Sequence, residues 1–104
     1  MTDKIMIGMV NDIPTLETIV SQRQQAVDAS EPKEFDTELF RGYIRLSNMY
    51  FKELNGEKAR ANLRQAVQHY SILSHSKEDR KGKRFYHTML TGMADILDYK
   101  LEIF

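Results

Sequence analysis

The chain of 104 residues contains no cysteine, only two prolines and only five glycines. The lack of cysteine excludes disulfides, thiolate zinc sites, iron–sulfur clusters and cysteine nucleophiles. The scarcity of proline and glycine favours long helices over a turn-rich sheet protein. The longest apolar run, residues 5–10, is far shorter than the roughly 20 residues of a membrane-spanning helix. One lysine precedes it and no small-residue cleavage pattern follows, so we expect a cytoplasmic protein without a secretory signal or membrane contact.

The size and composition favour one globular domain over residues 1–104. Apolar residues make up 41% of the chain and charged residues 29%, which is typical of globular rather than disordered proteins. Fifteen basic and fifteen acidic residues cancel, but residues 57–87 hold eight basic and three acidic residues, a net charge of +5. This excess indicates either solvated helix faces or a basic patch that meets an acidic partner protein or nucleic acid.

Apolar residues recur at steps of three and four along four segments, which predicts an all-α bundle or array of about four amphipathic helices. The first helix is expected over residues 13–29, because Asp12 is a good N-cap and Pro14 fits the first turn. Residues 1–11 form either a separate arm or a kinked extension of this helix.

The second predicted helix begins after Asp36, a suitable N-cap, and is apolar on more than one face over residues 39–54. A helix of this kind usually lies centrally, with neighbours on two sides. Asn55 and Gly56 are expected to end it, with the glycine in the left-handed conformation.

A third helix is predicted over residues 57–74, and a fourth after Ser76, which has Asp79 at capping-box spacing. The apolar period of the fourth helix continues to residue 104, so we expect the helix to reach the end of the chain. Gly92 lies inside this helix, where either a close helix crossing or simple tolerance explains a glycine.

Part of the central region resembles the helix hairpin of one tetratricopeptide repeat. The residues that match the family pattern are Tyr43, Leu46, Ser47, Tyr50, Ala59, Leu63 and Ala66. Ser47 replaces the usual glycine, Ser71 stands where proline is frequent, and no second copy follows at the repeat period of roughly 34 residues. The resemblance, over residues 43–66, implies a scaffold that binds a protein or peptide and performs no chemistry.

The residues that usually carry catalysis or bind metals form no recognisable pattern. His69, His75 and His87 lack the i, i+4 spacing of a helical metal site, and neither a nucleophile elbow nor a phosphate-binding glycine loop occurs. Asp95 and Asp98 share a helix face, but their polar neighbourhood predicts solvated carboxylates rather than an acid–base pair. We therefore expect no enzymatic activity, no metal site and no cofactor.

The most distinctive segment, residues 77–87, places basic residues beside aromatic rings. Its candidate partner-binding residues are Lys77, Arg80, Lys81, Lys83, Arg84, Tyr86 and His87. A solvated helix start followed by core aromatics would produce the same pattern, as would an acidic-protein contact or a nucleic-acid contact. The whole chain lacks the positive excess of a dedicated nucleic-acid binder. We expect a small accessory, regulatory or inhibitory protein that binds another protein, with a nucleic-acid-associated protein as the alternative.

Two further expectations concern packing. Tyr50, Leu63 and Leu90 are predicted to be buried in the core. Residues 5–10 and 39–54 together offer more apolar area than a small bundle covers, and large exposed apolar patches usually mark interfaces. The sequence therefore predicts a homodimer.

Overall fold

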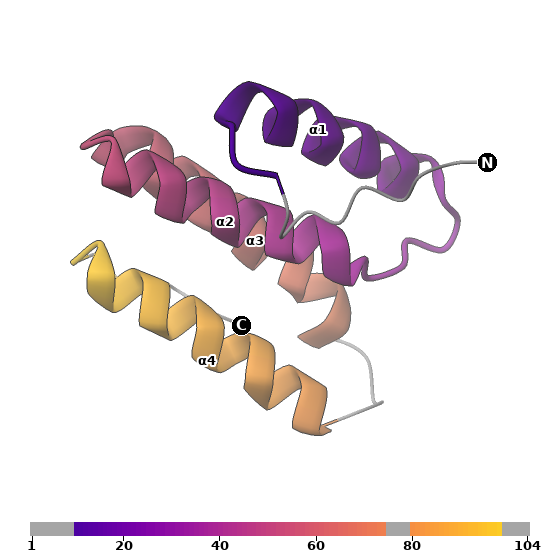
Figure 1. Cartoon of the computed structure of the whole chain (residues 1–104). Coiled ribbons are helices and arrows are strands. Elements are labelled where there is room, and N and C mark those ends of the chain that lie inside the picture. Colours follow the sequence, from indigo (N-terminus) through magenta and orange to yellow (C-terminus); the bar gives the residue numbers. More distant parts are fainter. Residues whose placement is uncertain (1–9, 75–79, 99–104) are drawn as a thin grey trace.

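The computed structural model describes residues 10–74 and 80–98, with only the backbone described at residues 74, 80 and 81. These residues form four α-helices and no strand: α1 (Ile13–Ala29), α2 (Thr37–Lys52), α3 (Gly56–Ser74) and α4 (Arg80–Ile96). The hairpin of α2 and α3 is the centre of the fold, with α1 packed on α2 and α4 packed on α3 and α2 (Figure 1). Successive helices run in opposite directions, so α2 and α4 are roughly parallel (Figure 1). The predicted all-α bundle is confirmed.

Helix α1 begins and ends at the predicted residues. The Asp12 carboxylate accepts a hydrogen bond of 3.0 Å from the Thr15 backbone N–H, and the bonds from the Thr15 side chain and backbone together lower the pKa of Asp12. Residues 10–12 are not helical, so the helix has no extension there. Val10 is buried and its carbonyl accepts a hydrogen bond of 2.9 Å from Arg45 Nε, which attaches this stretch to α2. Residues 1–9 lie outside the described part of the chain.

The turn between α2 and α3 differs from the prediction, because Leu54 rather than Gly56 takes the left-handed conformation, with φ of 61°. The Asn55 N–H donates to the Tyr50 carbonyl at 2.9 Å and closes the last turn of α2. The Asn55 side chain then accepts a hydrogen bond of 3.2 Å from the Lys58 N–H and caps α3. Since Asn55 starts the next helix, the reversal falls on the residue before it, and Gly56 is simply the first residue of α3.

Helices α2 and α3 approach closely because small side chains lie between them. Ser47 is fully buried, and its hydroxyl donates to the Ala59 carbonyl at 2.7 Å, which joins the two helices. All seven residues of the tetratricopeptide-like pattern are buried, although the hydroxyls of Tyr43 and Tyr50 donate to Gln24 and Glu17 of α1 rather than to α3. The predicted burial of Tyr50, Leu63 and Leu90 is confirmed, with exposed fractions of 5%, 0% and 0%.

A cluster of aromatic rings connects α4 and the loop after α1 to the central hairpin. The Phe35 ring, in that loop, stacks on the His69 ring of α3 at a centroid distance of 4.8 Å. The Tyr86 ring of α4 lies 5.0 Å from both Phe35 and Phe40. Aromatic pairs at such distances add to the stability gained from burial. The cluster therefore anchors the first half of α4, where the sequence is rich in charge.

Helix α4 ends at Ile96, so the predicted continuous helix to residue 104 is wrong at residues 97 and 98. Asp98 has a φ of 49° and its N–H donates to the Asp95 carbonyl at 3.2 Å, which turns the chain. Aspartate tolerates this left-handed region better than most residues, because its short polar side chain bonds locally. The predicted cap of residues 76–79 and the end of the chain, residues 99–104, lie outside the described residues.

Candidate protein interface

The predicted basic segment is only partly described by the structure. Lys77 precedes the described part of α4, and the side chains of Arg80 and Lys81 in its first turn are not described. Lys83 is half-buried, and its carbonyl accepts a hydrogen bond of 3.2 Å from the Tyr70 hydroxyl of α3. Arg84 is exposed. The described basic side chains therefore differ in burial, Lys83 beside the central hairpin and Arg84 toward solvent.

The aromatic members of this segment also differ in direction. Tyr86 is half-buried in the aromatic cluster, and its hydroxyl lies 3.2 Å from the Thr37 hydroxyl at the start of α2. His87 is exposed, with its ring edge-on to Tyr70 at 6.5 Å. Phe85, beside Tyr86, is 55% exposed. Because only Tyr86 turns inward, Phe85 is the large ring of the segment that a partner can reach.

Phe85 belongs to an exposed apolar stripe on α4, defined here as Phe85, Met89, Gly92 and Ile96. At 100° per residue these four positions lie within roughly 60° of one another around the helix. Ile96 is 52% exposed and Met89 is partly buried against the core. A Cβ added at Gly92 would meet nothing within 4 Å, so the centre of the stripe is open. The structure thus shows no close helix crossing at Gly92 within the described residues.

Charged residues are distributed unevenly beside this stripe. Arg84 is exposed near the beginning of α4, whereas Asp95 and Asp98 are exposed at its end. Both carboxylates are therefore solvated, as predicted. Arg84 therefore lies beside Phe85 at one end of the stripe, and Asp95 lies beside Ile96 at the other end.

The stripe was not predicted from the sequence, from which the exposed apolar surface was expected in residues 5–10 and 39–54 instead. Most large apolar residues of the predicted patch 39–54 are buried, which corrects that expectation, and the strongly exposed ones are Phe51 at 40% and Leu54 at 93%. The other large apolar residues of 39–54 are covered because α1, α3 and α4 pack around α2. The spacing of four, three and four residues from Phe85 to Ile96 is the signal that would have identified the stripe.

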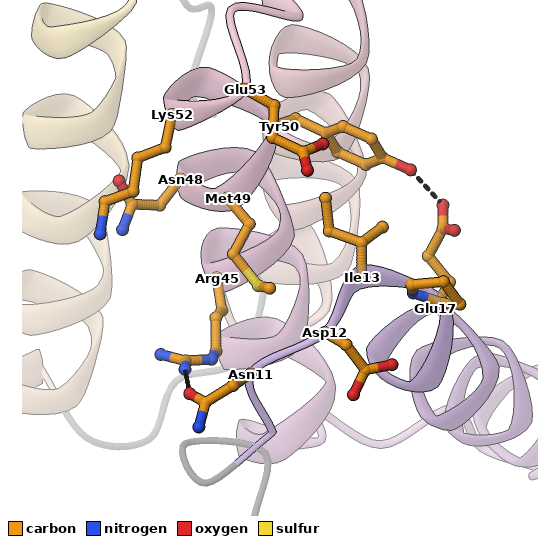
Figure 2. A pocket seen from close by; sticks show the side chains of 11 residues that line it. Asn11, Asp12, Ile13, Glu17, Arg45, Asn48, Met49, Tyr50, Lys52 and Glu53 are labelled. Carbon is orange, nitrogen blue, oxygen red and sulfur yellow. Dashed lines mark hydrogen bonds between the residues drawn. The ribbon is translucent and has the colours of Figure 1, made fainter.

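A pocket of about 760 Å³ lies between the beginning of α1 and the second half of α2 (Figure 2). Eight of its eleven lining residues are polar or charged. Arg45 Nη2 donates to the Asn11 side chain at 3.1 Å, and the Tyr50 hydroxyl donates to Glu17 at 2.7 Å. Ligand pockets of this size are usually lined mainly by apolar groups. The hydrogen bonds of the pocket instead connect α1 and residue 11 to α2.

The titratable groups around this pocket have structural roles. Burial and the hydrogen bond to Glu17 raise the pKa of Tyr50 to about 12, so its hydroxyl keeps its proton at neutral pH. The pKa of Asp12 is lowered by the capping bonds from Thr15, so its carboxylate stays ionised. Acid–base catalysis is most effective when a group titrates near the working pH. The pKa shifts of Tyr50 and Asp12 both lead away from neutrality.

His69 is a core residue that organises the start of α2. Its Nε2 accepts a hydrogen bond of 2.8 Å from the Asp36 backbone N–H, which requires the neutral ring. Burial lowers the pKa of His69 below its ordinary value of 6.5. The Asp36 carboxylate caps α2 through the N–H groups of Glu38 and Leu39 and pairs with Arg23 at 2.8 Å. Among the described residues, no group of three or more histidine and carboxylate side chains is arranged to hold a metal ion.

Comparison with known proteins identifies no relative of this chain. No family model matches it, and neither a curated protein nor a solved structure matches it. The described helices include none with the length and apolar character needed to cross a membrane.

Proposed function

We propose that this protein is a non-enzymatic interaction module of the cytoplasm, which acts by packing the exposed face of α4 against a helix of a protein partner. One observation carries the proposal. The apolar stripe has two large side chains, Phe85 and Ile96, each more than half exposed, on either side of the open Gly92. Isolated exposed apolar residues are ordinary, but several on one helix face usually mark an interface.

The stripe suits a helical partner in particular. Amphipathic helices bind through side chains at spacings of three and four residues, and a glycine lets the facing backbone or a large side chain approach closely. Arg84 at one end of the face provides a contact for an acidic partner residue. The balanced charge of the whole chain favours a protein partner over nucleic acid, and Tyr86, half-buried among core rings, is not available to stack on bases.

Photocrosslinking in cells tests the proposal. A benzophenone amino acid placed at Thr88, which is exposed beside the stripe, should form an adduct with a protein, and the same group at the exposed Gln65 of α3 should not. Ile96→Asp should abolish the adduct. Leu54→Asp is the matched control, because Leu54 is also an exposed apolar residue but lies at the turn after α2.

Two outcomes would refute the proposal. If Thr88 and Gln65 give the same adducts, the face of α4 has no preference for a partner. If nuclease treatment removes the Thr88 adduct, the nucleic-acid alternative replaces the protein partner, and Arg84→Gln should then weaken binding in a salt-dependent way.

A further inference from the structure

We propose that the partner on this face is a second copy of the same chain, and that the two α4 helices pack antiparallel about a twofold axis. The inference rests on the proposed function, because it names the occupant of the same apolar stripe. Three independent features of α4 support it: the spacing of the stripe, the shape at Gly92 and the distribution of charge along the helix.

The spacing defines which residues meet. Steps of four, three and four residues are those of a coiled-coil seam, in which alternate positions are of the d and a type. Phe85 and Gly92 are then d positions, and Met89 and Ile96 are a positions. In an antiparallel pair each a residue faces a d residue of the other helix. Phe85 therefore faces Ile96 of the second copy, and Met89 faces Gly92 of the second copy.

The shapes of these pairs are complementary. Methionine is long, unbranched and flexible, so it fills irregular spaces. Gly92 provides such a space, since a Cβ built there would meet nothing within 4 Å. The twofold axis makes each pair occur twice, so two methionines fill two glycine gaps. The half-exposed Phe85 and Ile96 cover each other at both ends of the seam.

The charges select the antiparallel orientation. In this register Arg84 is nearly level with Asp95 of the second copy, and both side chains are exposed beside the seam. A parallel pair would instead leave Arg84 roughly 16 Å along the seam from Asp95 of the second copy, so this contact between opposite charges would be lost. The opposed helix dipoles also favour the antiparallel arrangement.

The size of the seam indicates a reversible dimer. The stripe spans twelve residues from Phe85 to Ile96, or roughly 17 Å at 1.5 Å per residue. A single helix pair of this length buries less area than a typical stable interface. We therefore expect a dissociation constant on the order of micromolar, rather than an obligate dimer.

Sedimentation equilibrium of the full chain from about 1 µM to 1 mM tests the inference, since it measures the dimer dissociation constant directly. The steric variant is Gly92→Leu, which has open space within its own copy and so keeps the fold, but collides with Met89 of the second copy. We expect at least a roughly tenfold weaker dimer, with unchanged or increased helicity by circular dichroism. Thr91→Leu is the matched control, because it adds the same side chain on a face of α4 away from the stripe and should leave dimerisation unchanged.

Charge reversal tests the register. Arg84→Glu alone and Asp95→Arg alone should each weaken the dimer roughly 3- to 10-fold, and the double variant should return to within about 3-fold of the parent. A parent chain that stays monomeric at 1 mM overturns the inference, as does a Gly92→Leu variant that dimerises like the parent. A monomeric parent whose Thr88 still crosslinks to a different protein refutes the second copy and leaves the proposed function standing.

Discussion

Two leucines at opposite extremes of burial allow a sharp test of the packing. Leu63 in the middle of α3 is fully buried, whereas Leu54 at the turn after α2 is 93% exposed. Leu63→Ala and Leu54→Ala remove the same atoms from the same chain. Any difference between them therefore measures what the core of this fold contributes, free of the intrinsic chemistry of the substitution.

The exposed fractions of the two leucines set the expected change in the free energy of unfolding for each variant. Removing the Leu63 side chain loses its transfer free energy and leaves a cavity between α2 and α3, which together cost about 2–5 kcal/mol in comparable sites. A domain of this size is typically stable by about 5–15 kcal/mol, so the loss is a large share of the total. Leu54→Ala leaves both the left-handed backbone and the solvated environment unchanged, and we expect a change within about 0.5 kcal/mol.

Urea unfolding followed by circular dichroism, with both variants at one protein concentration, measures the difference. The fixed concentration is necessary because dimerisation adds to the apparent stability. A midpoint that shifts strongly for Leu63→Ala and hardly for Leu54→Ala is the expected result. Equal shifts would refute the helix packing described here, because residue 63 would then not face the core.

Three further changes have defined outcomes in the same assay. Leu54→Gly should raise the free energy of unfolding by about 0.5–1 kcal/mol, because glycine adopts a φ of 61° without strain. Ser47→Ala should lower it by about 1 kcal/mol through loss of the hydrogen bond to Ala59, and a larger loss is expected for Ser47→Val, which overpacks the contact. The pKa of His69 in the folded protein lies below 6.5. As the pH falls, the His69 ring therefore gains its proton in the unfolded chain before it does in the folded one. The contribution of His69 to the free energy of unfolding is complete above pH 6.5 and is lost as the pH falls through the folded pKa. His69→Gln should remove this pH dependence of the stability.

Helix α1 and the beginning of α2 were predictable because strong local signals mark them. Asp12 and Asp36 both cap a helix through their side chains, and Pro14 restricts the start of α1 to the turn that follows Asp12. These effects act within three or four residues and need no tertiary information.

The predictions that were wrong concern the ends of α2 and α4, where the sequence allows two different local conformations. At the α2–α3 turn, Gly56 was expected in the left-handed conformation. Asn55 instead caps α3 with its side chain, so the left-handed residue is Leu54, which precedes it. At the end of α4, the apolar period continues in the sequence, but Asp98 turns the chain. The spacing of apolar residues shows which side chains can share a helix face. It does not show where a single residue with a left-handed backbone ends the helix.

The exposed stripe of α4 was missed for a related reason. The inward face of this helix has Tyr86, Leu90 and Met93, with Leu97 directly after its end, and the stripe repeats the same spacing one residue earlier. Together the two sets make α4 apolar over a wide arc. Only the packing of α2 and α3 decides which half of the arc is covered, and that is a long-range contact that the sequence does not display.

Distance measurement between spin labels tests the central claim most directly, namely that α4 is the interface and pairs antiparallel with a second copy. The chain has no cysteine, so single cysteines introduced at Thr88 and at Asp98 carry the labels without further changes. The antiparallel register predicts a short distance between labels at residue 88, close to the twofold axis. For labels at Asp98, about seven and a half residues from that axis, it predicts a separation along the helix of roughly 22 Å. Equally short distances at both positions would show parallel helices, and the absence of any defined distance at high concentration would contradict the dimer itself.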